Sequence, residues 1–511
     1  MSSLETPVKT RVFPVIGLEV HAQLQTRSKM FCACPVMVGA PPNSATCPVC
    51  LGFPGMLPVL NRHAVTLALR LALAVGAKIH PVSIFARKNY FYPDLPKGYQ
   101  ISQYDRPLAS GGAITIDTPS GEKTVRLVRI HLEEDAGKLL HDTPYDDVPT
   151  TASLVDWNRS GVPLVEIVSE PEIRSPEEAA AYLTELRRLL RYTGVSDGDM
   201  EKGNLRCDAN VSIRASENAP LGTRVEIKNL NSIRFVAKAL EHEIERQAGV
   251  VERGEKVVLE TRLWDTVAGR TVPMRSKEEA HDYRYFPEPD LGALQIDEAW
   301  KTEAAHELPE LPRARRARLV AEYGIPLADA ETLTSARELA DYYEKVARQV
   351  APKLAANWIT GEILRWMKER KHSLEEALSF SVGPDELAGL LKLVDKGDIP
   401  VAAAKDELAR IVKAIELSAQ VSVTAKATAS LSFSAEAILA RSGKISDAGA
   451  LTAAVAEIVS GNPSQVALYR AGKTQTFGWF VGQVMKKTSG RADPAAVREA
   501  LTKALGGAPA P

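Results

Sequence analysis

Long apolar runs are missing from this sequence, which argues against a membrane-spanning helix, and the N-terminal residues lack the apolar core of a secretory signal. An excess of one charge is also missing, because 63 Lys and Arg face 64 Asp and Glu. No basic field of the whole chain therefore indicates nucleic acid, and any RNA contact has to be local. Cysteine is scarce, with five in 511 residues and four of them between Cys32 and Cys50, which favours metal chemistry over a disulfide framework. We expect a cytoplasmic protein of several domains.

The four clustered cysteines form a Cys-x-Cys pair, Cys32 and Cys34, and a Cys-x-x-Cys pair, Cys47 and Cys50. Two thiolate pairs on either side of a short loop can surround one Zn²⁺ tetrahedrally and leave no open position. This spacing predicts a structural zinc site. The alternative is four reduced cysteines without metal. Cys207 stands apart, in a strand pattern, and is expected to be a small buried residue.

Residues 16–24 alternate between apolar and polar side chains, which predicts a half-buried strand. Its polar face carries Glu19 and His21, which stand close enough to share one cation or one proton. By itself, this alternation favours the solvated face of an edge strand. Further acids along the chain favour a site instead.

An alternating segment over residues 125–138 ends in three adjacent acids, which are hard to keep ionised together without a nearby cation. Glu166 lies inside an apolar run, where an unpaired carboxylate would cost several kcal/mol or would protonate. A metal ion is the simplest partner for it, and a salt bridge to an arginine such as Arg159 is the alternative. The three adjacent acids are Glu133, Glu134 and Asp135.

Two later segments, residues 205–214 and 225–231, continue the alternation with an unusually rich set of polar side chains. Such a face predicts the floor of a site for an anionic ligand and a metal. Its members are Arg206, Asp208, Asn210, Arg214, Glu226 and Lys228.

Aromatic and cationic residues interleave in the turn-rich segment 85–104. Arg87, Lys88 and Lys97 are candidate phosphate clamps in this segment. A packed aromatic loop with solvated lysines remains the alternative.

Helix signals appear in three places. Apolar residues at helical spacing predict an amphipathic helix over residues 62–77. Ser175 and Glu178 form a capping box before an apolar helical pattern. Beyond about residue 297, helical spacing and alanine dominate. Residues 461–503 are rich in Lys and Arg, which indicates either a small RNA-binding module or a solvated helix.

Six long stretches carry a resemblance: Gly-Leu-Glu-Val-His-Ala-Gln-Leu at 17–24, Arg-Lys-Asn-Tyr-Phe-Tyr-Pro-Asp at 87–94, His-Leu-Glu-Glu-Asp-Ala-Gly-Lys at 131–138, Leu-Val-Glu-Ile-Val-Ser-Glu-Pro at 164–171, Leu-Arg-Cys-Asp-Ala-Asn-Val-Ser at 205–212 and Asp-Tyr-Arg-Tyr-Phe-Pro-Glu-Pro-Asp at 282–290. Together they resemble the GatB family, the B subunits of the bacterial aspartyl/glutamyl-tRNA amidotransferase GatCAB. The resemblance spans nearly the whole chain, and only the Ser/Thr/Ala-rich segment 418–434 departs from the family pattern.

The resemblance implies an α+β fold: a cradle-shaped catalytic domain with an antiparallel sheet over residues 1–296, with a zinc-binding insertion near 32–50. An all-α helical domain over 297–410 and a YqeY-like tRNA-binding tail over 411–511 would follow. The implied activity is ATP-dependent conversion of Glu-tRNA(Gln), or of Asp-tRNA(Asn), into Gln-tRNA(Gln) or Asn-tRNA(Asn).

The resemblance also implies site residues. Lys88 would lie near the reacting carboxylate, and the four clustered cysteines would hold a structural zinc. Periodicity does not distinguish Glu134 from Glu133, so the choice of Glu134 follows from the family. The implied Mg²⁺ ligands are Glu19, His21, Glu134, Glu166 and Asp208. From the residue pattern, the predicted ATP-binding residues are Arg87, Lys88, Arg206 and Lys228.

No glutaminase motif is found in the sequence, so the ammonia has to come from elsewhere. In the family it comes through a channel from the GatA amidase subunit, with GatC completing a heterotrimer. We expect Glu134→Gln or His21→Ala to abolish phosphoryl transfer while tRNA binding survives. Two other functions stay open: a carboxylate-amine ligase acting on a free small molecule, and a zinc-stabilised RNA-binding scaffold. The related GatE proteins are disfavoured, because the chain has no room for their inserted domain.

Overall fold

The computed structural model describes most of the chain, and the chain divides after Pro312 into two compact units. No helix within the described parts is both long and apolar enough to cross a membrane. Two segments discussed above lie partly outside the described residues: residue 282 of the stretch 282–290, and residues 422–434 of the segment 418–434. The described residues are 12–37, 39–140, 152–274, 283–370, 382–421, 435–442, 448–488 and 490–506.

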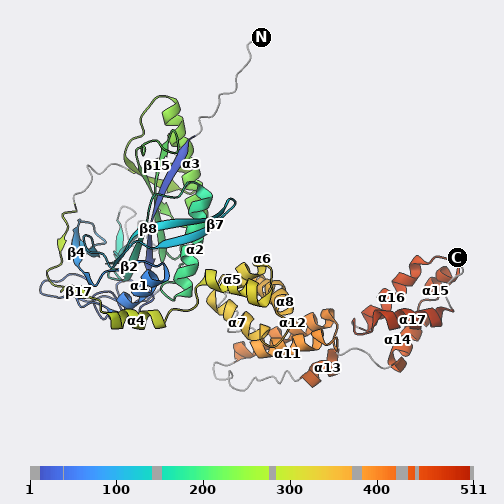
Figure 1. Cartoon of the computed structure of the whole chain (residues 1–511). Helices are drawn as coiled ribbons and strands as arrows, with labels where there is room; N and C mark the ends of the chain where they lie inside the picture. The colour runs from blue at the N-terminus through green and yellow to red at the C-terminus, as the bar shows by residue number, and fades with distance from the viewer. Residues whose placement is uncertain are drawn as a thin grey trace, which may run out of the picture. The chain divides into compact units, whose positions relative to one another are not determined.

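The first unit is built on a ten-stranded sheet in the order β15-β14-β13-β12-β1-β11-β8-β6-β2, with β7 paired to β8 (Figure 1). The strand predicted over 16–24 is β1, which lies at the centre of this order between β11 and β12. The bounds are β1 Phe13–Gln23, β2 Lys78–Ile79, β6 Ala109–Ser110, β7 Ala113–Thr118, β8 Gly121–Glu134, β11 Pro163–Ser169, β12 Leu205–Arg214, β13 Val225–Leu230, β14 Glu260–Asp265 and β15 Arg270–Pro273.

The predicted α+β class with an antiparallel sheet is confirmed, with one local difference. Within the described part of the large sheet, β13 and β14 form the one parallel pair. Helix α3 (Ile233–Glu252) joins these two strands. A helical crossover returns the chain to the end of the sheet where the first strand began, so the next strand runs parallel to it.

One face of the sheet is apolar and is packed against helices. Alternate residues of β1 such as Leu18 and Val20 are fully buried there. Helix α2 (Pro176–Tyr192) contacts α3 and β7, and α3 contacts β12 (Figure 1). The predicted N-cap is confirmed, because the side chain of Ser175 accepts a hydrogen bond from the backbone N–H of Glu178, but the carboxylate of Glu178 accepts from the N–H of Arg174, so the full capping box is not formed. The other face of the central strands stays polar.

Helix α1 (Arg62–Ala74) also belongs to the apolar core of the first unit. Its pattern predicts a helix to residue 77, but the helix ends earlier, because Gly76 adopts a left-handed conformation with φ of 67°. Glycine populates that conformation at little cost and commonly terminates helices.

Smaller strand groups complete the first unit. The aromatic segment 85–104 forms a hairpin of β4 and β5, which pairs with β16 in a three-stranded sheet. The bounds are β3 Val82–Ser83, β4 Phe85–Asn89, β5 Tyr99–Gln103, β9 Lys138–Leu140, β10 Leu154–Asp156, β16 Phe286–Pro287 and β17 Leu294–Gln295. Helix α4 (Glu298–His306) packs on α1, so this first helix beyond residue 297 lies in the first unit.

The second unit is helical throughout its described residues and contains two apolar clusters, one over 319–438 and one over 451–505. The predicted boundary between residues 410 and 411 falls inside α12. The bounds are α5 Pro312–Tyr323, α6 Leu327–Leu333, α7 Arg337–Ala347, α8 Pro352–Trp358, the π-helix η1 Ile359–Ile363, α9 Leu364–Arg370, α11 Pro384–Asp395, α12 Val401–Val421, α13 Ala435–Ser442, α14 Ala448–Ser460, α15 Pro463–Arg470, α16 Gln475–Lys487 and α17 Pro494–Leu505.

Candidate active site on the polar sheet face

The polar face of the large sheet aligns side chains from four neighbouring strands. His21 on β1 pairs directly with Glu166 on β11 and with Arg206 on β12. Glu166 in turn pairs with His131 on β8. Directly paired residues point to the same face of a sheet, and so does Glu133, two residues beyond His131. The register therefore brings together side chains that are far apart in the sequence.

These side chains form a compact group of two acids and two histidines. The Nε2 atom of His21 lies 3.4 Å from Oε2 of Glu166 and 3.5 Å from Oε1 of Glu133. The Nε2 atom of His131 lies 3.1 Å from Oε2 of Glu166 and 4.0 Å from Oε2 of Glu133. Within the described residues, His21, Glu133 and Glu166 offer three metal-ligating atoms that lie within 4.8 Å of one another. We call these three residues the carboxylate cluster.

The acids of the cluster favour a positive charge on His21. Burial opposes a charge on His21, but its hydrogen bond to Glu166 and the field of Glu133 outweigh burial and raise the pKa of His21 to about 9. Burial alone would raise the pKa of Glu166, yet the charges of His131 and His21 hold that pKa well below its usual range. His21 and Glu166 therefore form a charged pair, and a divalent cation bound by His21 would have to displace its proton. The alternative salt bridge between Glu166 and Arg159 is not formed, because Arg159 donates to the carbonyls of residues 136 and 137 instead.

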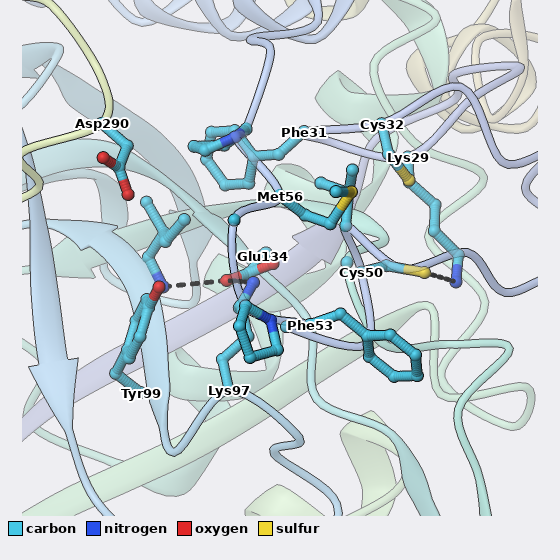
Figure 2. Close-up of a pocket in the computed structure, with 17 residues that line it drawn as sticks. Lys29, Phe31, Cys32, Cys50, Phe53, Met56, Lys97, Tyr99, Glu134 and Asp290 are labelled. Atoms are coloured by element: carbon cyan, nitrogen blue, oxygen red, sulfur yellow. Dashed lines mark hydrogen bonds and ion pairs between the residues drawn. The ribbon is translucent and has the colours of Figure 1, made fainter.

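Glu134 lies away from the cluster. It forms a buried ion pair with Lys97, and its carboxylate accepts a hydrogen bond from the backbone N–H of Ile101 at 3.0 Å. Successive residues of a strand face opposite sides, which separates Glu134 from Glu133. Glu134 and Lys97 line a cavity of about 190 Å³ beside Cys32 and the buried Cys50 (Figure 2). The structure thus brings Glu133, and not Glu134, to His21 and Glu166.

The other two acids expected at the metal, Glu19 and Asp208, lie beside the cluster on the polar face. Glu19 is two residues before His21 on β1, and Asp208 is its paired residue on β12. The Nζ atom of Lys228 donates to Oδ2 of Asp208 at 2.8 Å and lies 3.0 Å from Oε1 of Glu226. Asn210 donates to Oε1 of Glu19 at 2.9 Å. Burial and the fields of nearby acids, including Glu226 and Asp208, raise the pKa of Glu19. Lys228 therefore supplies the positive charge for this second group of acids.

Arg87 uses the Nε and Nη2 atoms of its guanidinium for contacts within the protein. Its guanidinium donates to both carboxylate oxygens of Glu288, at 2.7 and 2.8 Å, and to Asp290 at 3.1 Å. It also lies over the ring of Tyr99, 4.2 Å from the centroid. A bidentate pair of this kind is among the strongest hydrogen-bonded ion pairs. Arg87 thereby ties β4 to the chain around β16, which leaves little of its guanidinium for a phosphate.

Lys88 and Arg206 flank the carboxylate cluster. The Nζ atom of Lys88 lies 4.8 Å from the ring centroid of Tyr283. Burial disfavours its charge, but the field of Glu133 and those of other nearby groups together outweigh burial, so the pKa of Lys88 is raised. Arg206 donates to Oδ1 of Asp135 at 2.9 Å. Both side chains are therefore cationic beside the cluster.

The four clustered cysteines meet, as the spacing predicts. Their Sγ atoms all lie within 4.8 Å of one another. A zinc ion with four thiolates at about 2.3 Å separates the sulfurs by about 3.8 Å, so the arrangement fits a structural zinc. The thiol of Cys32 and the backbone N–H of Cys47, with Lys29, lower the pKa of Cys50 to about 4. Cys207 is buried in the core away from this group, as expected.

Two members of the site were not among the predicted ligands. His131 is 2% exposed and contacts Glu166, and Glu133 is equally buried. Both belong to the alternating segment 125–138, and their spacing of two residues was the signal that places them on one face. The pattern could not show which face met His21.

Comparison with known proteins gives matches over both units. A family model described as the GatB/GatE catalytic domain matches residues 14–302, and one described as the GatB domain matches residues 341–505. The chain belongs to the GatB/GatE family. The resemblance found in the motifs is thereby confirmed.

Individual relatives within the GatB/GatE family match over nearly their full length. The relative from Myxococcus xanthus is 51% identical over 96% of this chain and 98% of its own length. Those from Chlorobium phaeobacteroides and Thermodesulfovibrio yellowstonii are each 49% identical over 96% of this chain, and over 99% and 98% of their own lengths. All three are described as the B subunit of an aspartyl/glutamyl-tRNA(Asn/Gln) amidotransferase.

The site of this GatB/GatE chain has the groups that phosphoryl transfer requires. Two ionised carboxylates and an imidazole can hold a divalent cation, and flanking cations can neutralise phosphate oxygens. Phosphoryl transfer depends mainly on positioning and charge neutralisation. A rigid sheet supplies the positioning.

Proposed function

We propose that the chain is the B subunit of a tRNA-dependent amidotransferase, which converts Glu-tRNA(Gln), Asp-tRNA(Asn) or both into the amidated species. The observation that carries the proposal is the carboxylate cluster, with Lys88 beside it, in a chain that matches amidotransferase B subunits over almost its whole length. An enzyme of this kind is a carbon–nitrogen ligase of protein synthesis. Its charged tRNA substrates place it in the cytoplasm.

The reaction runs in two steps, phosphorylation of the carboxylate and then its amination. An oxygen of the side-chain carboxylate attacks the γ-phosphorus of ATP, a new O–P bond forms, and the bond to the β-phosphate oxygen breaks to release ADP. The nitrogen of ammonia then attacks the acyl carbon, the C–O bond to phosphate breaks, and inorganic phosphate leaves with loss of a proton from nitrogen. Activation is needed because ammonia cannot expel oxide from a carboxylate.

The residues of the site have separate tasks in these steps. His21, Glu133 and Glu166 would hold Mg²⁺, whose role when bound is to neutralise phosphate charge. Magnesium usually keeps several waters and few protein ligands, which fits three ligands on one face. Lys88 would neutralise charge near the reacting carboxylate, because its ammonium lies in the field of Glu133. Arg206 and Lys228 would attract the remaining phosphates.

The partners of the chain belong to the same proposal. Ammonia would come from the GatA amidase subunit, with GatC completing the heterotrimer. The helical second unit would bind the tRNA body, as implied by the basic segment 461–503. The four clustered cysteines would hold a structural zinc.

The experiment is ATP hydrolysis by the purified complex of this chain with its GatA and GatC partners, with and without Glu-tRNA(Gln), scoring phosphate release. Turnover that requires the misacylated tRNA is the expected result. Turnover indifferent to tRNA would favour a ligase acting on a free small molecule. Binding of tRNA without any turnover would favour an RNA-binding scaffold.

A further inference from the structure

Lys29, which follows β1 in the chain, is fully buried. Lysine is almost never fully buried unless its charge is paired. Among the residues that the structure describes, however, Lys29 forms no ion pair with a carboxylate within 4.0 Å. Its ammonium donates to the backbone carbonyl of Trp157 at 3.2 Å, and that group is neutral. An uncompensated buried ammonium is strongly destabilising, so another negative group has to balance it.

The two acids that line the cavity beside Lys29 already have partners of their own (Figure 2). Glu134 forms its buried ion pair with Lys97. Asp290 accepts a hydrogen bond from Arg87 at 3.1 Å. The charges of both carboxylates are therefore compensated without Lys29.

The side chain of Lys29 points to the four clustered cysteines instead. Its Nζ atom lies 3.6 Å from Sγ of Cys50, as the dashed line in Figure 2 shows. Its backbone N–H donates to the carbonyl of Cys34 at 2.9 Å, so Lys29 contacts a member of each cysteine pair. A Cβ atom at Gly161 would lie 3.5 Å from both Cδ of Lys29 and Cβ of Cys50. The lysine stem is thus confined beside the sulfur, with no route to solvent.

The charge of a metal held by these cysteines is the one that Lys29 can balance. Zinc with four thiolates carries a net double negative charge. Donors in the second shell of a metal site orient its ligands and tune how tightly the metal is held. We propose that Lys29 is the counter-cation of the zinc–thiolate site and slows the loss of zinc through its hydrogen bond to the sulfur of Cys50. This inference rests on the zinc site of the function proposed above and adds a residue that is not a ligand.

The same contact disfavours the alternative of four reduced cysteines without metal. A neutral thiol is a weak hydrogen-bond acceptor and carries no charge. Four neutral thiols would leave the ammonium of Lys29 uncompensated in the protein interior. A coordinated metal keeps its cysteine ligands deprotonated, so it supplies the negative charge that the buried lysine requires.

The test uses the zinc-loaded complex of the full chain with its partner subunits. Lys29→Met keeps most of the side-chain length and removes the charge. Lys29→Gln also removes the charge but keeps an N–H donor for the carbonyl of Trp157. Gln247→Met is the matched control, because Gln247 is equally buried and also donates to a backbone carbonyl at 3.2 Å, but lies on α3, outside the cysteine loop.

The first measurement is the rate at which zinc passes to a chromogenic chelator. We expect both Lys29 variants to release zinc at least about tenfold faster than the unaltered complex, a usual effect of removing a second-shell partner. The second measurement is the melting temperature with and without zinc. It should fall more in the zinc-loaded than in the zinc-depleted variants, because the double negative charge is present only with the metal. Gln247→Met should lower both melting temperatures alike and leave zinc release unchanged.

The other outcomes separate Lys29 from the site itself. Unchanged zinc release in the Lys29 variants, or an equal fall of both melting temperatures, overturns the role of Lys29 and leaves the zinc site standing. Fast release in Lys29→Met with slow release in Lys29→Gln assigns the effect to the hydrogen bond with Trp157 and also overturns the counter-cation. If the unaltered complex holds no zinc, the zinc site itself is wrong, while tRNA-dependent turnover still tests the amidotransferase function.

A structure of the unaltered zinc-loaded complex, with the metal located by anomalous scattering, decides the case in which neither Lys29 variant folds. An Nζ atom that stays about 3.6 Å from the zinc-bound sulfur of Cys50 supports the proposal. An Nζ atom turned to a carboxylate or to solvent overturns it.

Discussion

At the scale of single residues, the two adjacent acids at the end of β8 have different surroundings. Glu133 shares a face with His21 and lies 3.5 Å from it, and Glu134 points the other way into an ion pair with Lys97. Both are almost completely buried. When a buried carboxylate loses its charge, the cation beside it is no longer stabilised. Substitution of Glu133 should therefore affect metal binding, and substitution of Glu134 should affect the ion pair with Lys97.

We predict that Glu133→Gln reduces tRNA-dependent ATP turnover by at least about a hundredfold and raises the Mg²⁺ concentration needed for half-maximal rate. The reason is that an amide is a weaker ligand than a carboxylate for this hard cation. The measurement is phosphate release against Mg²⁺ concentration. Glu134→Gln is the matched control, because it removes the same charge one residue away.

The control should keep the Mg²⁺ dependence of the unaltered enzyme, with any loss arising from the unpaired Lys97. If instead Glu134→Gln shifts the Mg²⁺ dependence and Glu133→Gln does not, the Mg²⁺ ligand is Glu134, as the family resemblance implies, and not Glu133.

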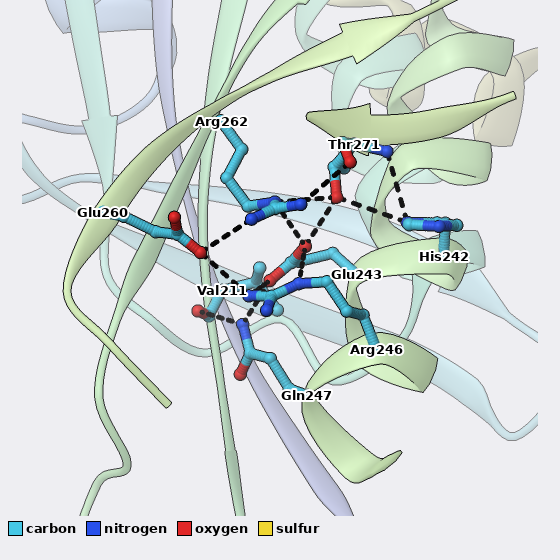
Figure 3. Close-up of polar contacts among 8 residues, drawn as sticks. All are labelled: Val211, His242, Glu243, Arg246, Gln247, Glu260, Arg262 and Thr271. Atoms are coloured by element: carbon cyan, nitrogen blue, oxygen red, sulfur yellow. Dashed lines mark hydrogen bonds and ion pairs between the residues drawn. The ribbon is translucent and has the colours of Figure 1, made fainter. Parts of the chain in front are cut away.

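At the scale of elements, helix α3 is fixed to the sheet by a buried polar network (Figure 3). Glu243 is fully buried and accepts hydrogen bonds from Arg246, Gln247 and Thr271. Gln247 also donates to the backbone carbonyl of Val211 on β12, at 3.2 Å. This network ties the helix to β12, the strand that carries Asp208. It therefore holds the polar face from behind.

We predict that Glu243→Gln destabilises the first unit by about 3 kcal/mol, because it removes the buried carboxylate beside Arg246 and Arg262 and leaves them, among the described residues, only Glu260 as a charge partner. Burial alone would raise the pKa of Glu243, but Arg246, Gln247 and Thr271 outweigh it and lower that pKa. A carboxylate with a lowered folded pKa stabilises the fold above its unfolded pKa of about 4.3, and this contribution is lost as the pH falls through the folded pKa. The difference between the two proteins should therefore shrink on acidification.

Urea unfolding at several pH values measures this difference. Trp264 on β14 is 3% exposed and gives a fluorescence signal from this part of the sheet. Glu241→Gln, at an exposed position of α3, is the control and should change stability little. A loss in Glu243→Gln that is constant down to pH 3 would contradict the assigned role of the ionised carboxylate.

The loop that carries the four cysteines is the second element with a testable role. We predict that Cys47→Ser abolishes stoichiometric zinc and lowers the melting temperature, because a closed four-thiolate site contributes directly to folding. Zinc content by elemental analysis and a thermal melt measure the two effects. Cys207→Ala, a buried cysteine outside the cluster, should keep its zinc. Full zinc in Cys47→Ser would disprove four-cysteine ligation.

At the scale of the whole molecule, the candidate sites lie in the first unit, and the second unit is helical in its described residues. The carboxylate cluster and the four cysteines both lie before the division at Pro312. The described second unit has its own apolar clusters. Each unit therefore has the core it needs to be stable by itself.

We predict that a truncated chain of residues 1–312 keeps the Mg²⁺-dependent affinity for a non-hydrolysable ATP analogue and loses at least about tenfold in affinity for tRNA, with a shallower dependence on salt. The physical reason is that the basic segment 461–503 is absent. Binding titrations at two salt concentrations measure this, with the full-length chain as control. Equal tRNA affinity for both chains would place the tRNA contacts in the first unit.

The sequence by itself determined the local elements, because these follow from patterns within a few residues. The polar face of β1, the cap of α2 and the thiolate spacing near Cys47 all depend on backbone periodicity or on short-range geometry. The long motifs also determined the family, since order and spacing along the chain carry that information.

Only the tertiary structure decided which distant side chains meet. Glu166 could pair with Arg159 or a metal on sequence grounds, and the register of β11 against β1 and β8 placed two histidines, and not Arg159, beside it. Arg87 is taken by Glu288, about two hundred residues away in the sequence. A shift of one residue in strand register would move every side chain of the strand to the opposite face of the sheet. Long-range pairing is therefore decided by the packing of the whole sheet, which no local pattern contains.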